Sequence, residues 1–426
     1  MSSSAQALLT FIDKNPTAFH AVDSLTSELV AHGFEKLDES NAWQIKEDSS
    51  YFVCRGDASI IAFRTPSQWS ANAAFKIIGA HTDSPALKVK SKPTSTREGY
   101  QVLNIEVYGG ALLTSWFDKD LLLGGRVLYQ DQDGKLQSTL IQLPYRLRIP
   151  RLAIHLDRMV NKEGFKVNPQ EHLCPILGLD NERDFEAWIA KEAAIQGQLL
   201  SWDLFLFDAE KASFGGVNNE FIYASRLDNL ASVHAATQAL LSSAPHPHDF
   251  LLGAFFQHEE VGSTSQNGAD SNFIETVLKR IVLAFTDKQE TFFQSVASSF
   301  FISTDMTHAV HPNYGSAHDP QHKPMLNKGP VIKSNANMRY ATDAFSIAKF
   351  KQWCHKAGVS FQDFCNRNDM GCGSTIGPMV AANLGIATID IGNAMLSMHS
   401  IREMAGTDDH QMMIDVFQAF FDSQTL

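Results

Sequence analysis

The chain has 426 residues and a mass of 47.2 kDa, which is long for a single hydrophobic core, so we expect two domains. Its 44% hydrophobic and 19% charged residues are typical of a globular protein and argue against long disordered stretches. The net charge of −12 disfavours nucleic acid and anionic membrane surfaces as partners, and an acidic ligand would need a locally positive site.

The five cysteines are scattered and include no C-x-x-C pair. This usage suits a reducing compartment and argues against a zinc site made of thiolates. The N-terminal residues lack the basic region of a signal peptide, and no apolar run reaches the length of a membrane span. We therefore expect a cytoplasmic protein with no membrane contact.

The first quarter of the chain alternates helical and strand-like patterns. Residues 5–32 predict two helices, with Pro16 in the first turn of the second. Residues 51–55 and 59–63 flank a Gly-Asp turn and predict a hairpin. Residues 75–80 form a short apolar run typical of a buried strand.

The stretch from 92 to 222 is richer in strand patterns. Residues 102–107 alternate with a period near two, and a hairpin is predicted around Asp133-Gly134. Residues 199–207 again read as a strand, and residues 184–196 as a helix. We interpret residues 92–222 as an inserted β-rich domain, with a catalytic domain formed by residues 1–91 and 223–426.

The last part of the chain returns to alternating strands and helices, which predicts an α/β fold. A helix should run from Ser225 to Leu241, and another from a cap at Thr342 to Gly358. Further helices should follow the glycine-rich turn 371–377 and occupy residues 408–421; a helix N-terminus after that turn could also hold a substrate carboxylate. Apolar runs predict three strands, at residues 251–256, 299–303 and 385–391.

Polar side chains lie beyond the carboxyl ends of four of the predicted strands. These side chains are His81 with Asp83, Glu259 with Glu260, Asp305 with His308, and His399. Open α/β sheets bind their ligands at this edge, so we expect the side chains to meet there. Histidine and carboxylate sets without cysteine suit zinc, manganese or cobalt. The set offers more ligand side chains than one tetrahedral ion needs, so a site with two metal ions is the more specific hypothesis.

Simpler interpretations exist for each part of this set. Ser225-x-x-Asp228 fits a helix capping box, and Glu259 and Glu260 could be solvated charges at the sheet rim. A zincin helix is excluded, because H-E-x-x-H would need histidine where the chain has Gly262. If the adjacent glutamates are functional, one can bind metal while the other faces the nucleophilic water.

Ordered motifs along nearly the whole chain resemble aspartyl aminopeptidases of the bacterial type. The motifs are His81-Thr-Asp83-Ser-Pro85, Tyr108-Gly-Gly110 with Trp116-Phe-Asp118, Ile154-His155-Leu156, Ser225-Arg-Leu-Asp228-Asn, His258-Glu259-Glu260-Val-Gly-Ser263, Asp305-Met-x-His308, Lys328-Gly-Pro-Val-Ile-Lys333, Arg339-Tyr340, Gly373-Ser-Thr-Ile-Gly-Pro378 and Met398-His399-Ser-Ile-Arg-Glu-Met404. The resemblance implies a dizinc exopeptidase-like fold, with a mixed central sheet covered by helices on both faces. The inserted β-rich domain would serve dimerisation, and dimers would assemble into a homo-oligomer, a dodecamer.

The resemblance also implies a role for each site residue. Asp228 would bridge two divalent ions, most simply zinc, with cobalt and manganese as alternatives. The remaining metal ligands would be His81 and Asp305 on one ion, and Glu260 and His399 on the other. Glu259 would be the general base, with Asp83 orienting His81. His155 would reach the active site of a neighbouring subunit and contact the substrate or count among the zinc residues, and the substrate-binding residues would be His308, Lys333 and Tyr340.

The reaction implied is hydrolysis of the peptide bond after an N-terminal Asp or Glu, with a water activated by two metal ions. Lys333 would be the partner of the substrate's acidic side chain, which meets the need for a locally positive site. Two other classes stay open from the residues alone. One is a metal-dependent amidohydrolase acting on N-acyl substrates, and the other is a catalytically silent assembly protein.

Overall fold

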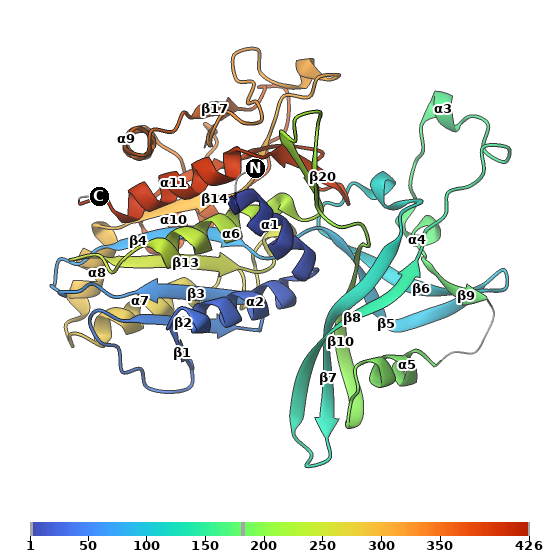
Figure 1. Ribbon diagram of the computed structural model, residues 1–426, viewed down its shortest axis with the longest axis horizontal. Helices are drawn as coiled ribbons and strands as arrows, with labels where there is room; N and C mark the ends of the chain where they lie inside the picture. The colour runs from blue at the N-terminus through green and yellow to red at the C-terminus, as the bar shows by residue number, and fades with distance from the viewer. Residues whose placement is uncertain (1–2, 180–183, 425–426) are drawn as a thin grey trace. The chain divides into compact units, whose positions relative to one another are not determined.

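The computed structural model describes residues 3–179 and 184–424 (Figure 1). Its contacts divide the chain into two compact units. The first comprises Met1–Asp83, Ala212–Met398 and Glu403–Leu426, and the second comprises Ser84–Lys211 and His399–Arg402. The insert predicted at residues 92–222 overlaps most of the second unit, whose main stretch, Ser84–Lys211, begins and ends earlier along the chain.

The first unit is built on a mixed sheet that has nine strands in the described part of the chain. In spatial order they are β1 (Glu35–Leu37), β2 (Ser50–Arg55), β3 (Ser59–Arg64), β13 (Phe250–Phe256), β4 (Phe75–His81), β14 (Phe300–Thr304), β18 (Ala387–Gly392), β16 (Val331–Ser334) and β17 (Gln362–Cys365). β13, β4, β14 and β18 run parallel to one another at its centre. Every residue of β4 and β13 is buried, because helices cover both faces of these strands.

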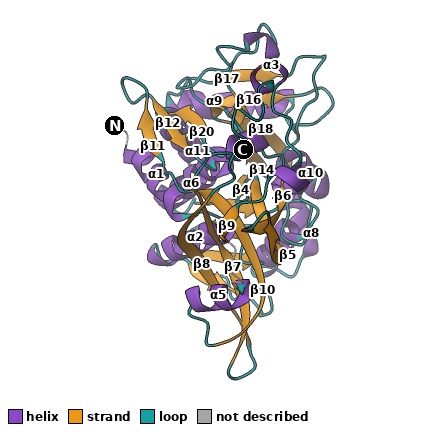
Figure 2. Ribbon diagram, turned by 90° about the vertical axis from the view of Figure 1, so that its right-hand side faces the viewer, coloured by secondary structure: helices purple, strands orange, loops and turns teal. Residues whose placement is uncertain are grey.

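Helices line each face of this sheet, as Figures 1 and 2 show. One hydrophobic core contains residues of α1 (Ser3–Lys14), α2 (Ala18–Ala31), α6 (Leu227–Ser242), α9 (Ala344–Ala357) and α11 (Asp409–Phe421). A second core contains residues of α7 (Phe273–Leu283), α8 (Gln289–Ala297) and α10 (Ile376–Leu384). Alternate strand residues divide between the cores, with Ile78 in the first and Ile77 in the second. The expected α/β architecture, a mixed central sheet with helices on both faces, is confirmed.

A small sheet completes the first unit. Its strands, in order, are β11 (Ser213–Gly215), β12 (Phe221–Ala224), β20 (Glu403–Gly406), β19 (Ala394–Leu396) and β15 (Thr307–His308). β15 pairs in parallel with β19, only a few residues beyond the ends of β14 and β18.

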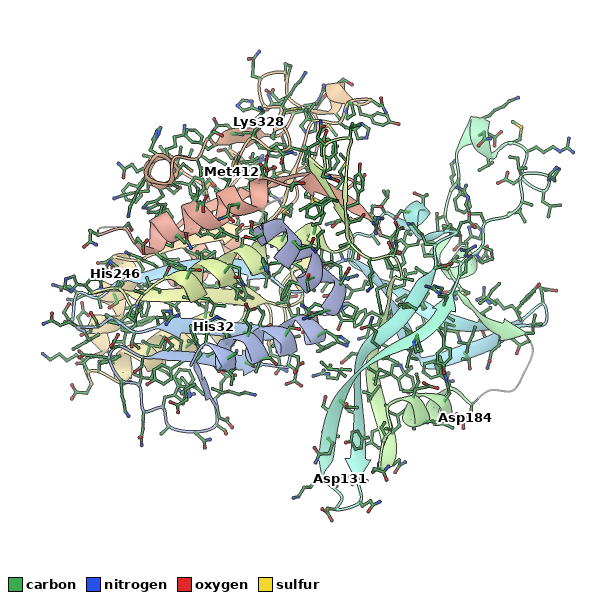
Figure 3. All side chains as sticks on the ribbon, in the orientation of Figure 1. His32, Asp131, Asp184, His246, Lys328 and Met412 are labelled. Carbon is green, nitrogen blue, oxygen red and sulfur yellow. The ribbon has the colours of Figure 1, made fainter. Side chains whose placement is uncertain are left out.

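The second unit contains a separate antiparallel sheet around its own core. The strand order is β8 (Leu136–Leu147), β7 (Leu121–Asp131), β10 (Gly197–Asp208), β5 (Ala86–Arg97), β6 (Tyr100–Tyr108) and β9 (Ile176–Leu179). Short helices α3 (Val160–Glu163), α4 (Pro169–His172) and α5 (Phe185–Glu192) accompany it. In Figure 3, labels mark Asp131 at the end of β7 and Asp184, whose carboxylate accepts hydrogen bonds at the start of α5.

Three local expectations need correction. Pro16 precedes α2 rather than lying in its first turn, because the helix is capped at Thr17. The cap of α9 is Asp343 instead of Thr342, and it forms a capping box with Ser346. The helix predicted to run to residue 196 ends at Glu192, and the next strand begins at Gly197.

Candidate metal centre

Three parallel strands of the first unit end side by side and carry the polar residues of the site. β4 ends at His81, which lies opposite Phe256, the last residue of β13. The backbone N–H of Thr82 donates to the carbonyl of Phe256 at 2.8 Å, so the two strand ends stay paired. β14 ends at Thr304, immediately before Asp305. The strand register therefore brings residues far apart in sequence to one edge of the sheet.

His81 stands at the centre of this edge and is almost completely buried. Its Nε2 atom lies 3.4 Å from Asp228 Oδ1, 3.5 Å from Asp305 Oδ1 and 3.9 Å from Glu259 Oε2. Its Nδ1 atom lies 3.0 Å from the backbone carbonyl oxygen of Asp83. If Nδ1 carries the proton and donates to that carbonyl, Nε2 keeps its lone pair for a metal ion.

Glu259 and Glu260 occupy a tight turn directly after β13. A 3₁₀ helix covers Glu259–Val261, and the residues on either side of it, His258 and Gly262, have positive φ angles. The backbone N–H groups of Glu259 and Glu260 each donate to the carboxylate of Asp83, at 3.2 Å. The turn is thus held just beyond the end of β4 by one buried carboxylate that accepts from both glutamates.

The buried carboxylates around His81 would be stabilised by a cation. Burial raises the pKa of Glu259 to about 8, with help from the carboxylates of Asp305, Asp83 and Asp228, although His81 lowers it. Burial by itself would lower the pKa of His81, yet the carboxylates of Asp228, Asp305 and Asp83 raise it well above its ordinary value. Several carboxylates competing for one histidine is the arrangement that a bound divalent ion stabilises.

The donor atoms fit such an ion in number and spacing. His81, Asp228 and Asp305 each offer a ligand atom within 4.8 Å of the other two, and His81, Glu259 and Glu260 form a second such group. Imidazole nitrogen with carboxylate oxygen, in a buried place, is a donor set that suits zinc. The residues present in the first unit therefore fit the predicted metal.

Asp228 reaches the cluster because the start of α6 is irregular. Asp228 and Asn229 have non-helical backbone angles, and the peptide bond between them is cis. The backbone N–H of Asp228 donates to Glu403 Oε2 at 3.2 Å, and the Asn229 side chain donates to Thr304 O at 2.9 Å. No side-chain capping bond is found at this helix start in the described chain, so the capping-box interpretation of Asp228 is wrong.

Lys333 approaches the same cluster from β16. Its side chain is buried, and its ammonium donates to the carbonyl of Met306 at 2.9 Å. The ammonium also lies 3.3 Å from Asp305 Oδ2 and 5.4 Å from the centre of the Tyr340 ring. Lys333 thus supplies a positive charge beside Asp305 and helps to fix that carboxylate.

Comparison with known proteins agrees with this site. Residues 11–421 match the model of the peptidase M18 family, described as aminopeptidase I zinc metalloproteases. The chain belongs to the M18 aminopeptidase family. It is 42% identical to a probable M18 family aminopeptidase 2 of Clostridium acetobutylicum, over 98% of both chains, and 43% identical to one of Ectopseudomonas mendocina, over 99% and 98%. The family resemblance drawn from the motifs is confirmed, and the protein is a zinc aminopeptidase.

Solved structures support the M18 assignment. A cryo-EM structure of the Ape4 and Nbr1 complex matches with a TM-score of 0.95 and 39% identity, over 99% of this chain and 85% of that one. Yeast aminopeptidase 1 matches with a TM-score of 0.85 and 30% identity, over 98% and 96%. A dodecamer of mature Ape1 from S. cerevesiae matches with a TM-score of 0.86 and 30% identity, over 98% and 96%.

The other predicted site residues of this M18 aminopeptidase lie in three places. His308 is on β15 in the first unit, with its ring near that of Phe364. His399 opens the short segment His399–Arg402 of the second unit, where its Nδ1 atom lies 3.1 Å from Gly110 O. His155 lies on an exposed turn of the second unit. The roles of these histidines stay predictions.

Two features of the M18 site were not assigned from sequence. Glu403, which is buried and fixes the Asp228 backbone, belongs to the motif that starts at Met398, so its position could have been noticed. The start of α10 already faces an internal carboxylate, since Asp390 lies against Gly377 and accepts from Thr375 at 2.6 Å. This occupies the place where the sequence allowed a substrate carboxylate.

Proposed function

We propose that this M18 aminopeptidase removes N-terminal Asp and Glu from peptides and holds two divalent metal ions per subunit, most simply zinc. The observation that carries the proposal is the gathering of Asp228, Asp305 and Glu259 around Nε2 of His81, within 3.9 Å. His81, Asp228 and Asp305 would hold one ion, with Asp228 shared and Glu260 and His399 completing the other. When bound, the ions supply Lewis-acid activation of the scissile carbonyl and of a water.

Glu259 is the proposed general base. It takes a proton from the attacking water and delivers it to the amine that leaves as the peptide bond breaks. Burial and the neighbouring carboxylates raise the pKa of Glu259 to about 8, and bound cations would lower it again, so this carboxylate can exchange a proton near neutral pH. Asp83 positions this group, because it accepts from the N–H of Glu259.

Substitution of Glu259 tests this division of labour. Glu259→Gln should lower kcat by about a thousandfold, within the range of general acid–base catalysis, while zinc content stays near that of the wild type. Glu260→Gln is the matched control and should lose metal, because that carboxylate is a proposed ligand. If Glu259→Gln loses metal and activity together, Glu259 is a ligand and the assignment is wrong.

The preference for acidic residues rests on Lys333. This ammonium is a cation 3.3 Å from Asp305, a proposed ligand, and is therefore near where the first substrate residue would bind. A carboxylate on the substrate would be attracted there despite the net charge of −12. His308 and Tyr340 are proposed to line the same place.

A substrate panel separates the possible roles of Lys333. Aspartyl, glutamyl, leucyl and N-acetylated chromogenic substrates should be compared with and without a chelator, for the wild type and Lys333→Met. If Lys333 binds the acidic side chain, the ratio of kcat/KM for aspartyl over leucyl substrate should fall at least about tenfold in the variant. An equal fall for all substrates would mean that Lys333 only fixes Asp305, and cleavage of blocked substrates alone would refute the aminopeptidase specificity.

The proposal includes a homo-oligomer built from dimers, with a dodecamer as the expected size. Large apolar side chains are exposed on the stretch around His155, namely Leu152 at 62%, Ile154 at 47% and Leu156 at 74%. Adjacent exposed apolar residues of this kind mark protein–protein contacts. Sedimentation velocity at several protein concentrations measures the assembly directly, and a stable monomer would refute it.

Among the described helices, none combines the length and hydropathy that a membrane span requires.

A further inference from the structure

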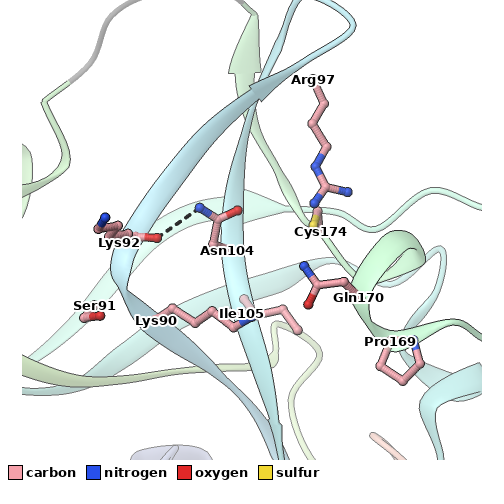
Figure 4. A pocket seen from close by; sticks show the side chains of 9 residues that line it. All are labelled: Lys90, Ser91, Lys92, Arg97, Asn104, Ile105, Pro169, Gln170 and Cys174. Atoms are coloured by element: carbon pink, nitrogen blue, oxygen red, sulfur yellow. Dashed lines mark hydrogen bonds between the residues drawn. The ribbon is translucent and has the colours of Figure 1, made fainter.

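The second unit contains a cavity of about 410 Å³ with an unusual charge pattern (Figure 4). Lys90, Lys92 and Arg97 line it together with Asn104, Gln170 and Cys174, and no carboxylate side chain is among the described residues that line it. Three cations share one cavity in a protein of net charge −12. Cationic side chains that line one cavity give it a positive potential, which favours a multiply charged anion.

The cavity owes its shape to a large bulge in β5. Val89 pairs with Ile105, and Thr94 pairs with Leu103, so the four residues 90–93 stand opposite the single residue Asn104. Bulges of this kind change where side chains point and occur next to functional sites. Here the bulge places Lys90 and Lys92 at the cavity.

Hydrogen bonds hold the bulge and the arginine in place. The side-chain amide of Asn104 donates to Lys92 O at 2.9 Å, and its oxygen accepts from Ser95 Oγ at 2.8 Å. Arg97 Nη1 donates to the backbone carbonyl oxygen of Glu171, in α4, at 3.3 Å. A guanidinium has five N–H donors, so this one bond orients the group and leaves its fork able to bind an oxyanion. Figure 4 shows the residues that line the cavity and the hydrogen bond from Asn104 to Lys92.

We propose that this cavity binds the phosphate monoester of a small metabolite. Arg97 would bind two phosphate oxygens, Lys90 and Lys92 would balance the charge, and Gln170 would donate its amide hydrogens. A phosphate monoester carries nearly two negative charges near neutral pH, which matches three cations better than a single carboxylate does. The volume of about 410 Å³ exceeds that of phosphate alone and lies within the range of small-molecule pockets. This site is separate from the proposed peptide chemistry in its residues, since none of the residues that line it is proposed to bind the metals or the peptide.

Cys174 gives a local measurement of occupancy. It is a free, half-buried thiol in the cavity lining, and Cys54, Cys365 and Cys372 are free, half-buried thiols elsewhere. Alkylation by iodoacetamide is followed at each cysteine by peptide mass spectrometry of the zinc-loaded protein. The probe is ribose 5-phosphate, and ribose is its uncharged control. At about ten times Kd, the rate at Cys174 should fall about tenfold, because the empty fraction of sites falls in that proportion.

Substitution of the cationic side chains tests whether they are responsible for the protection of Cys174. Lys90→Gln with Arg97→Gln should abolish protection of Cys174, and Arg97→Lys should weaken it by at least about tenfold in Kd, because lysine lacks the planar fork. Lys135→Gln with Lys191→Gln removes the same charge from exposed positions of the second unit and should leave protection unchanged. Thermal unfolding of each variant, compared with the wild type, identifies any loss of fold.

Three results with ribose 5-phosphate would overturn the site. They are no change at Cys174 with ribose 5-phosphate, equal slowing at all half-buried cysteines, or equal protection in the variant that lacks Lys90 and Arg97. Reactivity of Cys174 that follows protein concentration rather than ribose 5-phosphate would instead make this cavity a contact between copies of the chain, and would also overturn it.

Discussion

Replacement of Asp83 by Asn tests which interactions hold the turn that contains Glu259 and Glu260. The family resemblance implies that Asp83 orients His81, yet the Asp83 carboxylate lies 3.6 Å from His81 Nδ1, whereas the Asp83 backbone carbonyl oxygen lies at 3.0 Å. The same carboxylate accepts from the N–H groups of Glu259 and Glu260, each at 3.2 Å. The side chain is therefore a better partner of the turn than of the imidazole.

The expected effect of Asp83→Asn on the turn follows from those two hydrogen bonds. An asparagine side chain keeps one oxygen and presents an NH₂ group to the other backbone N–H, so one of the two bonds is lost. A bond to a charged acceptor contributes about 1.5–3 kcal/mol, and the site is buried, so we expect Asp83→Asn to weaken the turn by about 2–3 kcal/mol. A displacement of about 1 Å of Glu259 would then reduce kcat about a hundredfold.

Zinc affinity should change much less, because the backbone carbonyl of residue 83 still accepts from His81. We expect a fall in affinity of less than about tenfold, compared with the 10–100-fold typical when a partner of a ligating histidine is lost. Initial rates on an aspartyl chromogenic substrate give kcat, and titration against a fluorescent chelator gives zinc affinity. Asp270→Asn, which removes a charge from an exposed position of the same unit, is the control.

A fall in zinc affinity as large as the fall in kcat would refute this reasoning. It would mean that the carboxylate acts through the imidazole of His81 after all. Unchanged kcat and affinity would mean that the two N–H bonds do not hold Glu259 in the active enzyme.

Three further predictions concern other parts of the chain. Glu403→Gln weakens the bond that fixes Asp228, so zinc affinity should fall about 10–100-fold, as measured by chelator titration, and unchanged affinity would contradict this role. His155→Ala should lower kcat without changing the assembly seen by sedimentation, and mixed oligomers with subunits that lack the proposed base should regain activity; no regain would contradict a cross-subunit role. His234 Nδ1 and His410 Nε2 lie 2.8 Å apart in a buried place, where burial lowers the pKa of His234 to about 4 and that of His410 well below its ordinary value. The unfolded chain binds these protons at a higher pH than the folded chain does. The free energy of unfolding is therefore highest above about pH 6.5 and falls towards pH 4, by roughly 3 kcal/mol for His234. Urea unfolding across that range should show this slope, and His234→Phe with His410→Leu should reduce it.

Much of the site could be predicted from the sequence because parallel strands share one functional edge. Apolar runs that stop at His81, at Glu259 and Glu260, and at Asp305 mark strand ends, and a central α/β sheet brings such ends together. Local patterns were sufficient there because the burial of a whole strand leaves an apolar run that composition alone reveals. Helix caps were predicted less well, since the choice between Thr342 and Asp343 depends on one hydrogen bond.

The order of residues along the chain was enough to identify the family, the α/β class, and the residue types at the sheet edge that suit a metal. The partner of each of these side chains became known only from the folded structure. The bond from Glu260 N–H to Asp83 joins residues 177 positions apart, and that from Asp228 to Glu403 joins residues 175 positions apart. Such contacts carry no periodicity along the chain and arise only when the sheet aligns its strands. For the same reason, the sequence shows a lysine in a short strand but could not show that Lys333 pairs with Asp305.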